Sequence, residues 1–171
     1  MRVVAGSAGG QRLHSPPGRR LRPTSERVRE AVFSSLASMD VIADASVLDL
    51  FAGTGALGIE ALSRGAATAT FVDADETAMA MVRANLLRTG FTGRGTLVRG
   101  DAVRFVETAA DAGETFDVIL ADPPYAFDGW PTLLARLPAT VAVLESDRPL
   151  EPGPGWSAHS TEVSHSPVTA S

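Results

Sequence analysis

Residues 122–125, of sequence DPPY, end an apolar run and could hold a flat amine. Prolines cannot donate ladder hydrogen bonds, so Pro123 and Pro124 end a strand and stiffen the turn that follows. A stiff turn fixes the Asp122 carboxylate and the Pro123 carbonyl as acceptors for both N–H groups of an exocyclic amine. These bonds free the nitrogen lone pair to attack an electrophilic methyl group, and Tyr125 would stack on the base. The same residues could also form a plain turn with a packed tyrosine.

Residues 53–58, of sequence GTGALG, form a glycine-rich loop between a predicted strand and a predicted helix, and Asp73 follows Gly53 by 20 residues. This spacing is typical of sites for adenosine-containing cofactors, in which the acid binds ribose hydroxyls. NAD(P) and S-adenosylmethionine both contain this ribose, so Asp73 does not separate them. Asp49 favours S-adenosylmethionine, because a carboxylate inside an apolar strand needs a cationic partner such as the ammonium of a methionine group.

A third acid, Asp101, ends the next predicted strand. It could accept a hydrogen bond from an adenine amino group, while Ala102 offers its backbone N–H to the ring. Asp101 could equally be the N-cap of the helix that follows. Asp49, Asp73 and Asp101 end three successive strands, at the edge where open α/β sheets bind ligands.

The elements that position these acids alternate along the chain. Apolar runs predict strands at 46–51, 68–73, 96–99, 116–121 and 140–145, and amphipathic patterns predict helices at 56–64, 76–89, 102–110 and 131–137. Strands that are apolar on both faces indicate a parallel sheet covered by helices on each side, a doubly wound α/β fold.

Further elements are predicted at both ends of this single 171-residue domain. A hairpin of residues 2–5 and 11–15 and a helix over 25–36, capped by Ser25, precede the sheet. Segments 156–163 and 167–171 predict a terminal hairpin that brings the mostly parallel sheet to seven strands. We therefore divide the domain into a basic N-terminal arm, 1–24, and an α/β core, 25–171.

Charge is distributed unevenly. Residues 1–30 hold seven arginines against Glu26 and Glu30, whereas the remaining 141 residues hold eight arginines against 18 acids. A basic arm on an acidic body suits a polyanion at one end of the molecule. Alternatively, the arginines pair with the two glutamates along the helix, a contact of tenths of a kcal/mol.

Several kinds of chemistry are excluded by composition. The chain has no cysteine and no lysine, which excludes thiol nucleophiles, Schiff bases and a P-loop lysine, and its three histidines lack metal-ligand spacing. It also lacks an apolar run long enough for a signal peptide or a membrane span. We expect a cytoplasmic monomer without a metal.

The motifs together resemble one family of class I S-adenosylmethionine-dependent methyltransferases, the bacterial 16S ribosomal RNA guanine-N2 methyltransferases. The matching segments are VVAGSAGGQRL (3–13), LRPTSERVREAVFSSL (21–36), LDLFAGTGALGIEALSRGA (48–66) and DPPY (122–125), and the resemblance extends to about residue 156. It implies a Rossmann-like sheet, S-adenosylmethionine as cofactor, and methyl transfer to a guanine of ribosomal RNA in an assembling small subunit.

The resemblance also implies roles for individual residues. The target amine is held by Asp122, Pro123, Pro124 and Tyr125. The cofactor site consists of Asp49, Phe51, Gly53, Gly55, Asp73, Ala74, Asp101 and Ala102. RNA is contacted by Arg2, Arg12, Arg22, Thr24, Arg27 and Arg29. The chain departs from the family in its last residues, where STEVSHSPVTAS replaces basic residues and an aromatic-glycine turn.

Three other functions are compatible with parts of the pattern. An adenine-N6 DNA methyltransferase shares DPPY but ordinarily needs a larger recognition region than the 45 residues before the first core strand. An NAD(P) oxidoreductase is disfavoured by Asp49 and by the lack of a Tyr-Lys pair for proton transfer. A non-catalytic ribosome-binding protein would make Asp122 dispensable.

Overall fold

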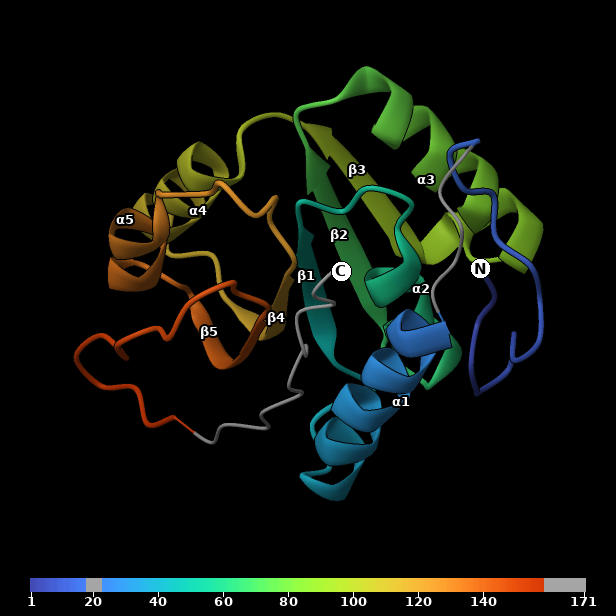
Figure 1. Cartoon of the computed structure of the whole chain (residues 1–171), viewed down its shortest axis with the longest axis horizontal. Helices are drawn as coiled ribbons and strands as arrows, with labels where there is room; N and C mark the ends of the chain where they lie inside the picture. The colour runs from blue at the N-terminus through green and yellow to red at the C-terminus, as the bar shows by residue number, and fades with distance from the viewer. Residues whose placement is uncertain (18–22, 159–171) are drawn as a thin grey trace, which may run out of the picture.

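A computed structural model describes residues 1–17 and 23–158. One sheet of five parallel strands has the order β3-β2-β1-β4-β5 (Figure 1). The strands are β1 (Ser46–Leu50), β2 (Thr68–Asp73), β3 (Gly95–Arg99), β4 (Phe116–Ala121) and β5 (Ala139–Leu144). The helices are α1 (Pro23–Ser38), α2 (Ala56–Ser63), α3 (Glu76–Thr89), α4 (Ala102–Asp111) and α5 (Trp130–Ala135), with a 3₁₀ turn, η1 (Thr92–Arg94), before β3.

The sheet is covered on both faces because its central strands are apolar on both faces. Val47 and Leu48 are neighbours in β1, and their side chains enter two different buried clusters. The first cluster contains residues of α1, α2 and α3, and the second contains residues of α4 and α5. Figure 1 shows these two sets of helices on opposite sides of the sheet. The predicted α/β fold with a parallel sheet is confirmed.

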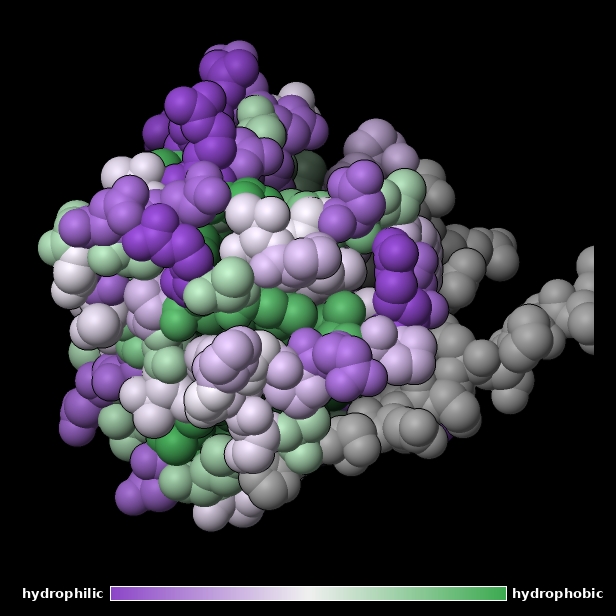
Figure 2. All heavy atoms as spheres, turned by 90° about the vertical axis from the view of Figure 1, so that its left-hand side faces the viewer, coloured by the Kyte–Doolittle hydropathy of each residue, from purple (hydrophilic) through white to green (hydrophobic). Residues whose placement is uncertain are grey.

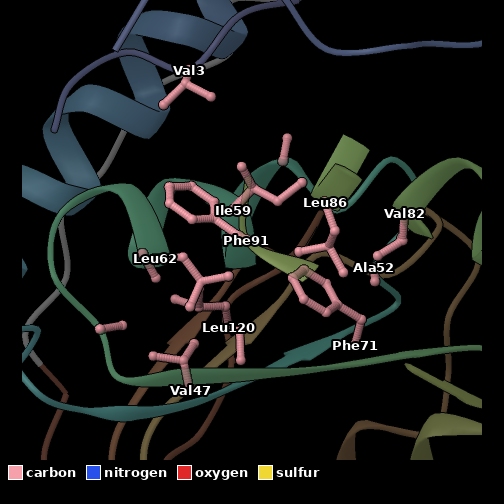
Figure 3. Close-up of a cluster of buried hydrophobic side chains, with 14 of the residues drawn as sticks. Val3, Val47, Ala52, Ile59, Leu62, Phe71, Val82, Leu86, Phe91 and Leu120 are labelled. Atoms are coloured by element: carbon pink, nitrogen blue, oxygen red, sulfur yellow. The ribbon is translucent and has the colours of Figure 1, made fainter. Parts of the chain in front are cut away.

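The first cluster also holds the N-terminal segment in place. Ile59 and Leu62 of α2 and Phe71 of β2 are at most 1% exposed, and Val3 is fully buried in the same cluster (Figure 3). Burying a side chain of this size contributes about 1.5–3 kcal/mol. The chain before α1 is therefore part of the folded core.

The face that carries α5 is less well covered. An apolar hollow of about 440 Å³ lies between α5 and the segment after β5, lined by Trp130, Leu134 and Leu150 among others. Figure 2, which views this side, shows an apolar band with hydrophilic groups on either side.

Two parts of the predicted fold are not confirmed. The sheet has five strands in the described part of the chain, where seven were predicted, and residues 156–158 are not in a strand. The rest of the predicted terminal hairpin, 159–171, lies outside the described residues. At the N-terminus, residues 2–5 and 11–15 form one antiparallel bridge, Arg2 to Arg12, rather than a pair of strands.

Several predicted boundaries shift by one to three residues. The first helix begins at Pro23, so Ser25 is in its first turn and is not the N-cap that we predicted. Proline suits the first helical position because its φ is already helical and that N–H has no partner in the helix. In the described residues, no helix combines the length and the apolar character that crossing a membrane requires.

Candidate active site

The carboxyl ends of β2, β1 and β4 bring the candidate residues to one edge of the sheet. Leu50 of β1 pairs with Val72 of β2 and with Ala121 of β4. Phe51, Asp73 and Asp122 are the next residues of these strands, so they lie side by side. The strand order reverses between β1 and β4, which is where open α/β sheets bind ligands.

The glycine loop turns sharply between β1 and α2. Gly53 and Gly55 have φ values of 56° and 79°, a left-handed backbone that glycine adopts without strain. Phe51 also has a positive φ, 57°, which costs a residue with a side chain about 1–3 kcal/mol. Strain of this kind concentrates at functional sites, and here it lies directly before the loop.

Asp73 joins the loops that follow β1 and β2. One carboxylate oxygen accepts the Gly53 N–H at 2.9 Å and the other accepts the Asp75 N–H at 2.9 Å. A carboxylate has about four lone-pair sites, so each oxygen retains capacity for a hydroxyl. The side chain is half-buried. Asp73 therefore shapes the glycine loop and can still accept hydrogen bonds from a ribose diol.

Asp49 is a buried acid beneath the same loop. Its side chain is 1% exposed, and its Oδ2 accepts the Gly58 N–H of α2 at 2.9 Å. Burial raises the pKa of Asp49 well above its usual range, the Gly58 bond opposes this shift, and the charges of Asp122 and Asp73 add to it. A cation near this edge would stabilise the ionised form. Gly58 permits the contact, since an added Cβ would lie 2.4 Å from the Phe71 ring.

The third acid caps a helix. Asp101 is exposed, and its carboxylate accepts the Arg104 N–H at 2.9 Å as the N-cap of α4. The predicted N-cap role is confirmed, and the contact with adenine stays a prediction. Ala102 is buried at the first position of α4, and Ala74 is exposed after β2.

The DPPY turn is joined to the glycine loop by aromatic side chains. The Phe127 N–H donates to the Pro124 carbonyl at 2.9 Å, which closes the turn. The Phe127 ring packs edge-on against Phe51 at 5.0 Å and against Trp130 at 5.1 Å. Tyr125 is 75% exposed and Asp122 is exposed, so both are accessible to a substrate. The turn thus presents polar groups to solvent from a fixed position beside the loop.

Comparisons with known proteins agree with this geometry. The model of a protein family described as conserved hypothetical protein 95 matches residues 1–153. The chain belongs to this family. The solved structure of yhhF from Escherichia coli is 34% identical and superimposes with a TM-score of 0.81, covering 96% of this chain and 92% of that one.

Two curated relatives link the family to ribosomal RNA by name. Ribosomal RNA small subunit methyltransferase D of Escherichia coli K12 is 41% identical over 125 residues, 73% of this chain and 60% of that protein. Its namesake in Haemophilus influenzae is 34% identical over 75% of this chain and 65% of that protein. The match thus spans less than two thirds of these relatives. The predicted membership of the 16S ribosomal RNA methyltransferase family is confirmed.

The structure of this family member separates the residues predicted to contact RNA. Arg2, Arg12 and Arg27 are exposed, and Arg2 and Arg27 line a hollow of about 280 Å³ together with Glu26 and Glu30. Arg22 lies outside the described residues, and the side chain of Thr24 is not described. Arg29 is only 5% exposed, and its Nη2 donates to the Arg2 carbonyl at 2.7 Å. Its position corrects our prediction of a surface residue.

Two polar residues that hold the N-terminal segment were missed by the sequence analysis. Glu60 of α2 is fully buried and accepts the Val4 and Ala5 N–H groups at 2.8 and 3.0 Å. Asn85 of α3 is also fully buried and bonds to His14. The available signal was a lone polar residue within an otherwise apolar helical pattern, which indicates a buried hydrogen-bonding role.

Proposed function

We propose that the chain transfers a methyl group from S-adenosylmethionine to the exocyclic N2 amine of a guanine in 16S ribosomal RNA. The main support is the adjacency of the glycine loop and the DPPY turn, joined by the Phe51–Phe127 contact at 5.0 Å. The names of the curated relatives supply the substrate class.

Three groups of the chain fit the cofactor. Asp49 is a buried carboxylate in need of a cation, which the ammonium of the methionine moiety supplies. Asp73 retains lone pairs for the ribose hydroxyls. At Gly53, an added Cβ would meet only the Phe51 carbonyl, at 4.0 Å, so the loop leaves open space where a cofactor would approach. When bound, S-adenosylmethionine supplies an electrophilic methyl group on a sulfonium.

The DPPY turn then holds and activates the nucleophile. The Asp122 carboxylate and the Pro123 carbonyl accept the two N–H groups of the guanine amine, and Tyr125 stacks on the base for about 1–3 kcal/mol. The nitrogen lone pair forms the new N–C bond as the C–S bond breaks, and that bonding pair stays on sulfur. The nitrogen loses one proton through Asp122, which is exposed to water. Positioning and local electrostatics supply most of the rate.

The function is tested with radiolabelled S-adenosylmethionine and three substrates: naked 16S ribosomal RNA, assembling small subunits and unmethylated DNA. We expect label in the ribosomal RNA, and mass spectrometry of the digested nucleosides should identify it as N2-methylguanosine. Label only in DNA, as N6-methyladenine, would replace the proposal with its first alternative. Calorimetric binding of NADH without binding of S-adenosylhomocysteine would replace it with an oxidoreductase.

Replacing Asp49 with asparagine should separate stability from cofactor binding. Because the folded pKa of Asp49 is raised, its ionisation destabilises the ligand-free fold, and this penalty grows as pH rises through the folded pKa. Asp49→Asn cannot ionise, so it should be the more stable protein at neutral and higher pH. That advantage should vanish at and below about pH 4, where Asp49 is protonated in both states.

The same variant should bind the cofactor product weakly. An asparagine keeps an acceptor for the Gly58 N–H but removes the charge that attracts an ammonium. A hydrogen bond to a charged group contributes about 1.5–3 kcal/mol, so the affinity for S-adenosylhomocysteine should fall about ten- to a hundredfold. Thermal unfolding as a function of pH and calorimetric titration measure the two effects. Unchanged affinity would remove Asp49 from the proposed cofactor site.

A further inference from the structure

Asn85 of α3 joins two segments that are distant in sequence. Its Oδ1 accepts the His14 N–H at 2.6 Å, and its Nδ2 donates to the His14 carbonyl at 3.1 Å. The same Nδ2 donates to the Thr54 carbonyl at 2.8 Å. One side-chain amide therefore bonds to the N-terminal arm, defined from here on as residues 1–14, and to the glycine loop.

The amide is fully committed to these contacts. Asn85 is 0% exposed, so water does not replace a lost partner, and both of its N–H donors and its oxygen are used. No other side chain supplies two donors and one acceptor in so short a group. A structural requirement for a polar residue in α3 would be met by fewer bonds, since Thr89 satisfies its own hydroxyl on the Asn85 and Leu86 carbonyls.

The bond to Thr54 acts on the part of the loop that meets the cofactor. Thr54 lies between Gly53 and Gly55, whose left-handed backbones set the path of the loop. The arm touches the same residue a second time, because the Thr54 hydroxyl lies 3.5 Å from the Met1 sulfur. A displacement of Thr54 therefore moves the groups that hold both ends of the arm.

The arm itself is stiff enough to transmit such a displacement. Val3 and Gln11, and Leu13 and Met1, are joined by backbone hydrogen bonds of 2.9 Å. Its exposed side chains include Arg2 and Arg12, which are two of the residues proposed to meet RNA. Asn85 thus lies between the proposed RNA surface and the proposed cofactor loop.

We propose that Asn85 is a positioning residue that couples the glycine loop to the N-terminal arm, so that a bound cofactor fixes the arm that faces the RNA. This inference rests on the proposed function, because it takes the loop to be a cofactor site. Coupling of this kind is reciprocal: RNA bound to the arm strengthens cofactor binding by the same factor. Asn85 touches neither ligand and acts through Thr54 and His14.

Amide hydrogen exchange with and without S-adenosylhomocysteine tests the coupling. The Val3, Gly10 and Leu13 amides are bonded within the arm and not to Asn85. In the wild type, the ligand should slow their exchange about fivefold or more, the lower range of typical couplings. In Asn85→Ala, the ligand should still slow exchange at Gly53 and Gly55 and leave the three arm amides unchanged.

Matched variants separate coupling from a loss of stability. Thr89→Val removes a buried polar group from the same helix and should retain the ligand effect on the arm. His14→Pro removes the N–H that Asn85 accepts, from an exposed residue whose replacement spares the core, and should lose the effect. His14→Ala changes only the ring, which lies 3.4 Å from Arg88, and should keep it.

Three results would overturn the inference. Arm amides that respond to the ligand equally in wild type, Asn85→Ala and His14→Pro would show that the coupling does not pass through Asn85. Arm amides that do not respond in the wild type would show that there is no coupling. Failure of the wild type to bind S-adenosylhomocysteine at all would overturn the proposed function together with this inference.

Discussion

Asp122→Ala is expected to lower kcat for methyl transfer to ribosomal RNA by about 10²- to 10³-fold, the loss typical of removing one preorganised polar group at a reaction centre. Alanine removes one of the two acceptors proposed for the guanine amine and leaves the Pro123 carbonyl. The nitrogen lone pair then stays delocalised in the base. Asp122→Asn keeps one acceptor oxygen without the charge and should fall between the wild type and the alanine variant.

The expected effect of Asp122→Ala is confined to catalysis. Asp122 is exposed and follows the last residue of β4, so its replacement leaves the buried clusters intact. The melting temperature and the affinity for S-adenosylhomocysteine should change little. Asp128→Ala is the matched control, because it removes another exposed acid six residues further along the same connection. Single-turnover assays on ribosomal RNA measure the effect, and a wild-type kcat in Asp122→Ala would exclude the proposed amine site.

The central fold could be predicted because its signals are local. β1, β2 and β4 are continuous apolar runs, and α3 begins after an aspartate and ends at Gly90, as helix-start and helix-stop signals predict. The Asp75 side chain indeed accepts the Thr77 N–H at 2.8 Å. Parallel strands with helical connections leave few arrangements, so the order of acids along one sheet edge also followed from the sequence.

The N-terminal part could not be predicted in the same way, because its contacts are distant in sequence. Gly6 has φ 85°, and an added Cβ would lie 1.9 Å from the Ser63 carbonyl oxygen, a close approach between segments 57 residues apart. The periodic pattern of α1 placed Arg29 on an arginine-rich surface. Its burial depends on Glu60, whose position relative to α1 no local pattern reveals.

The candidate site shows the same division. Spacing identified Asp73 as an acid near a glycine loop, but its bonds to the Gly53 and Asp75 N–H groups depend on how two loops meet. The Phe51–Phe127 contact was likewise invisible in the sequence, because the two rings come from different strand ends. Residue types predict which chemistry is available, whereas the contacts that fix its geometry arise only when the chain folds.

Glu60 is the residue on which the N-terminal part of the fold depends most. It is 0% exposed, and its carboxylate serves two backbone N–H groups, Arg64 Nε at 2.8 Å and, more distantly, Arg29 Nε at 3.7 Å. Burial lowers the pKa of Arg29, and the charge of Glu60 opposes that shift. Arg29 Nε has no hydrogen-bond partner within residues 1–17 and 23–158, so the ion pair is what compensates this buried charge.

Glu60→Ala should therefore lower the free energy of unfolding by about 3–5 kcal/mol, the loss typical of removing one partner from a buried ion pair. The variant leaves the Arg29 charge uncompensated and two backbone N–H groups without their acceptor. Urea denaturation followed by circular dichroism measures the loss. Glu76→Ala is the control, because Glu76 pairs with Arg99 at 3.3 Å with its side chain 79% exposed, and such surface pairs contribute about 0.2–1 kcal/mol.

A double variant identifies the cause of this loss. Replacing Arg29 with methionine in the Glu60→Ala background removes the uncompensated charge and keeps most of the apolar volume. It should recover part of the lost stability, because a buried charge costs more than a buried thioether. Arg29→Met should be less favourable in the wild type, where it leaves Glu60 with one cation fewer. Additive effects of the two substitutions would contradict an ion pair and would assign the loss to the backbone N–H groups alone.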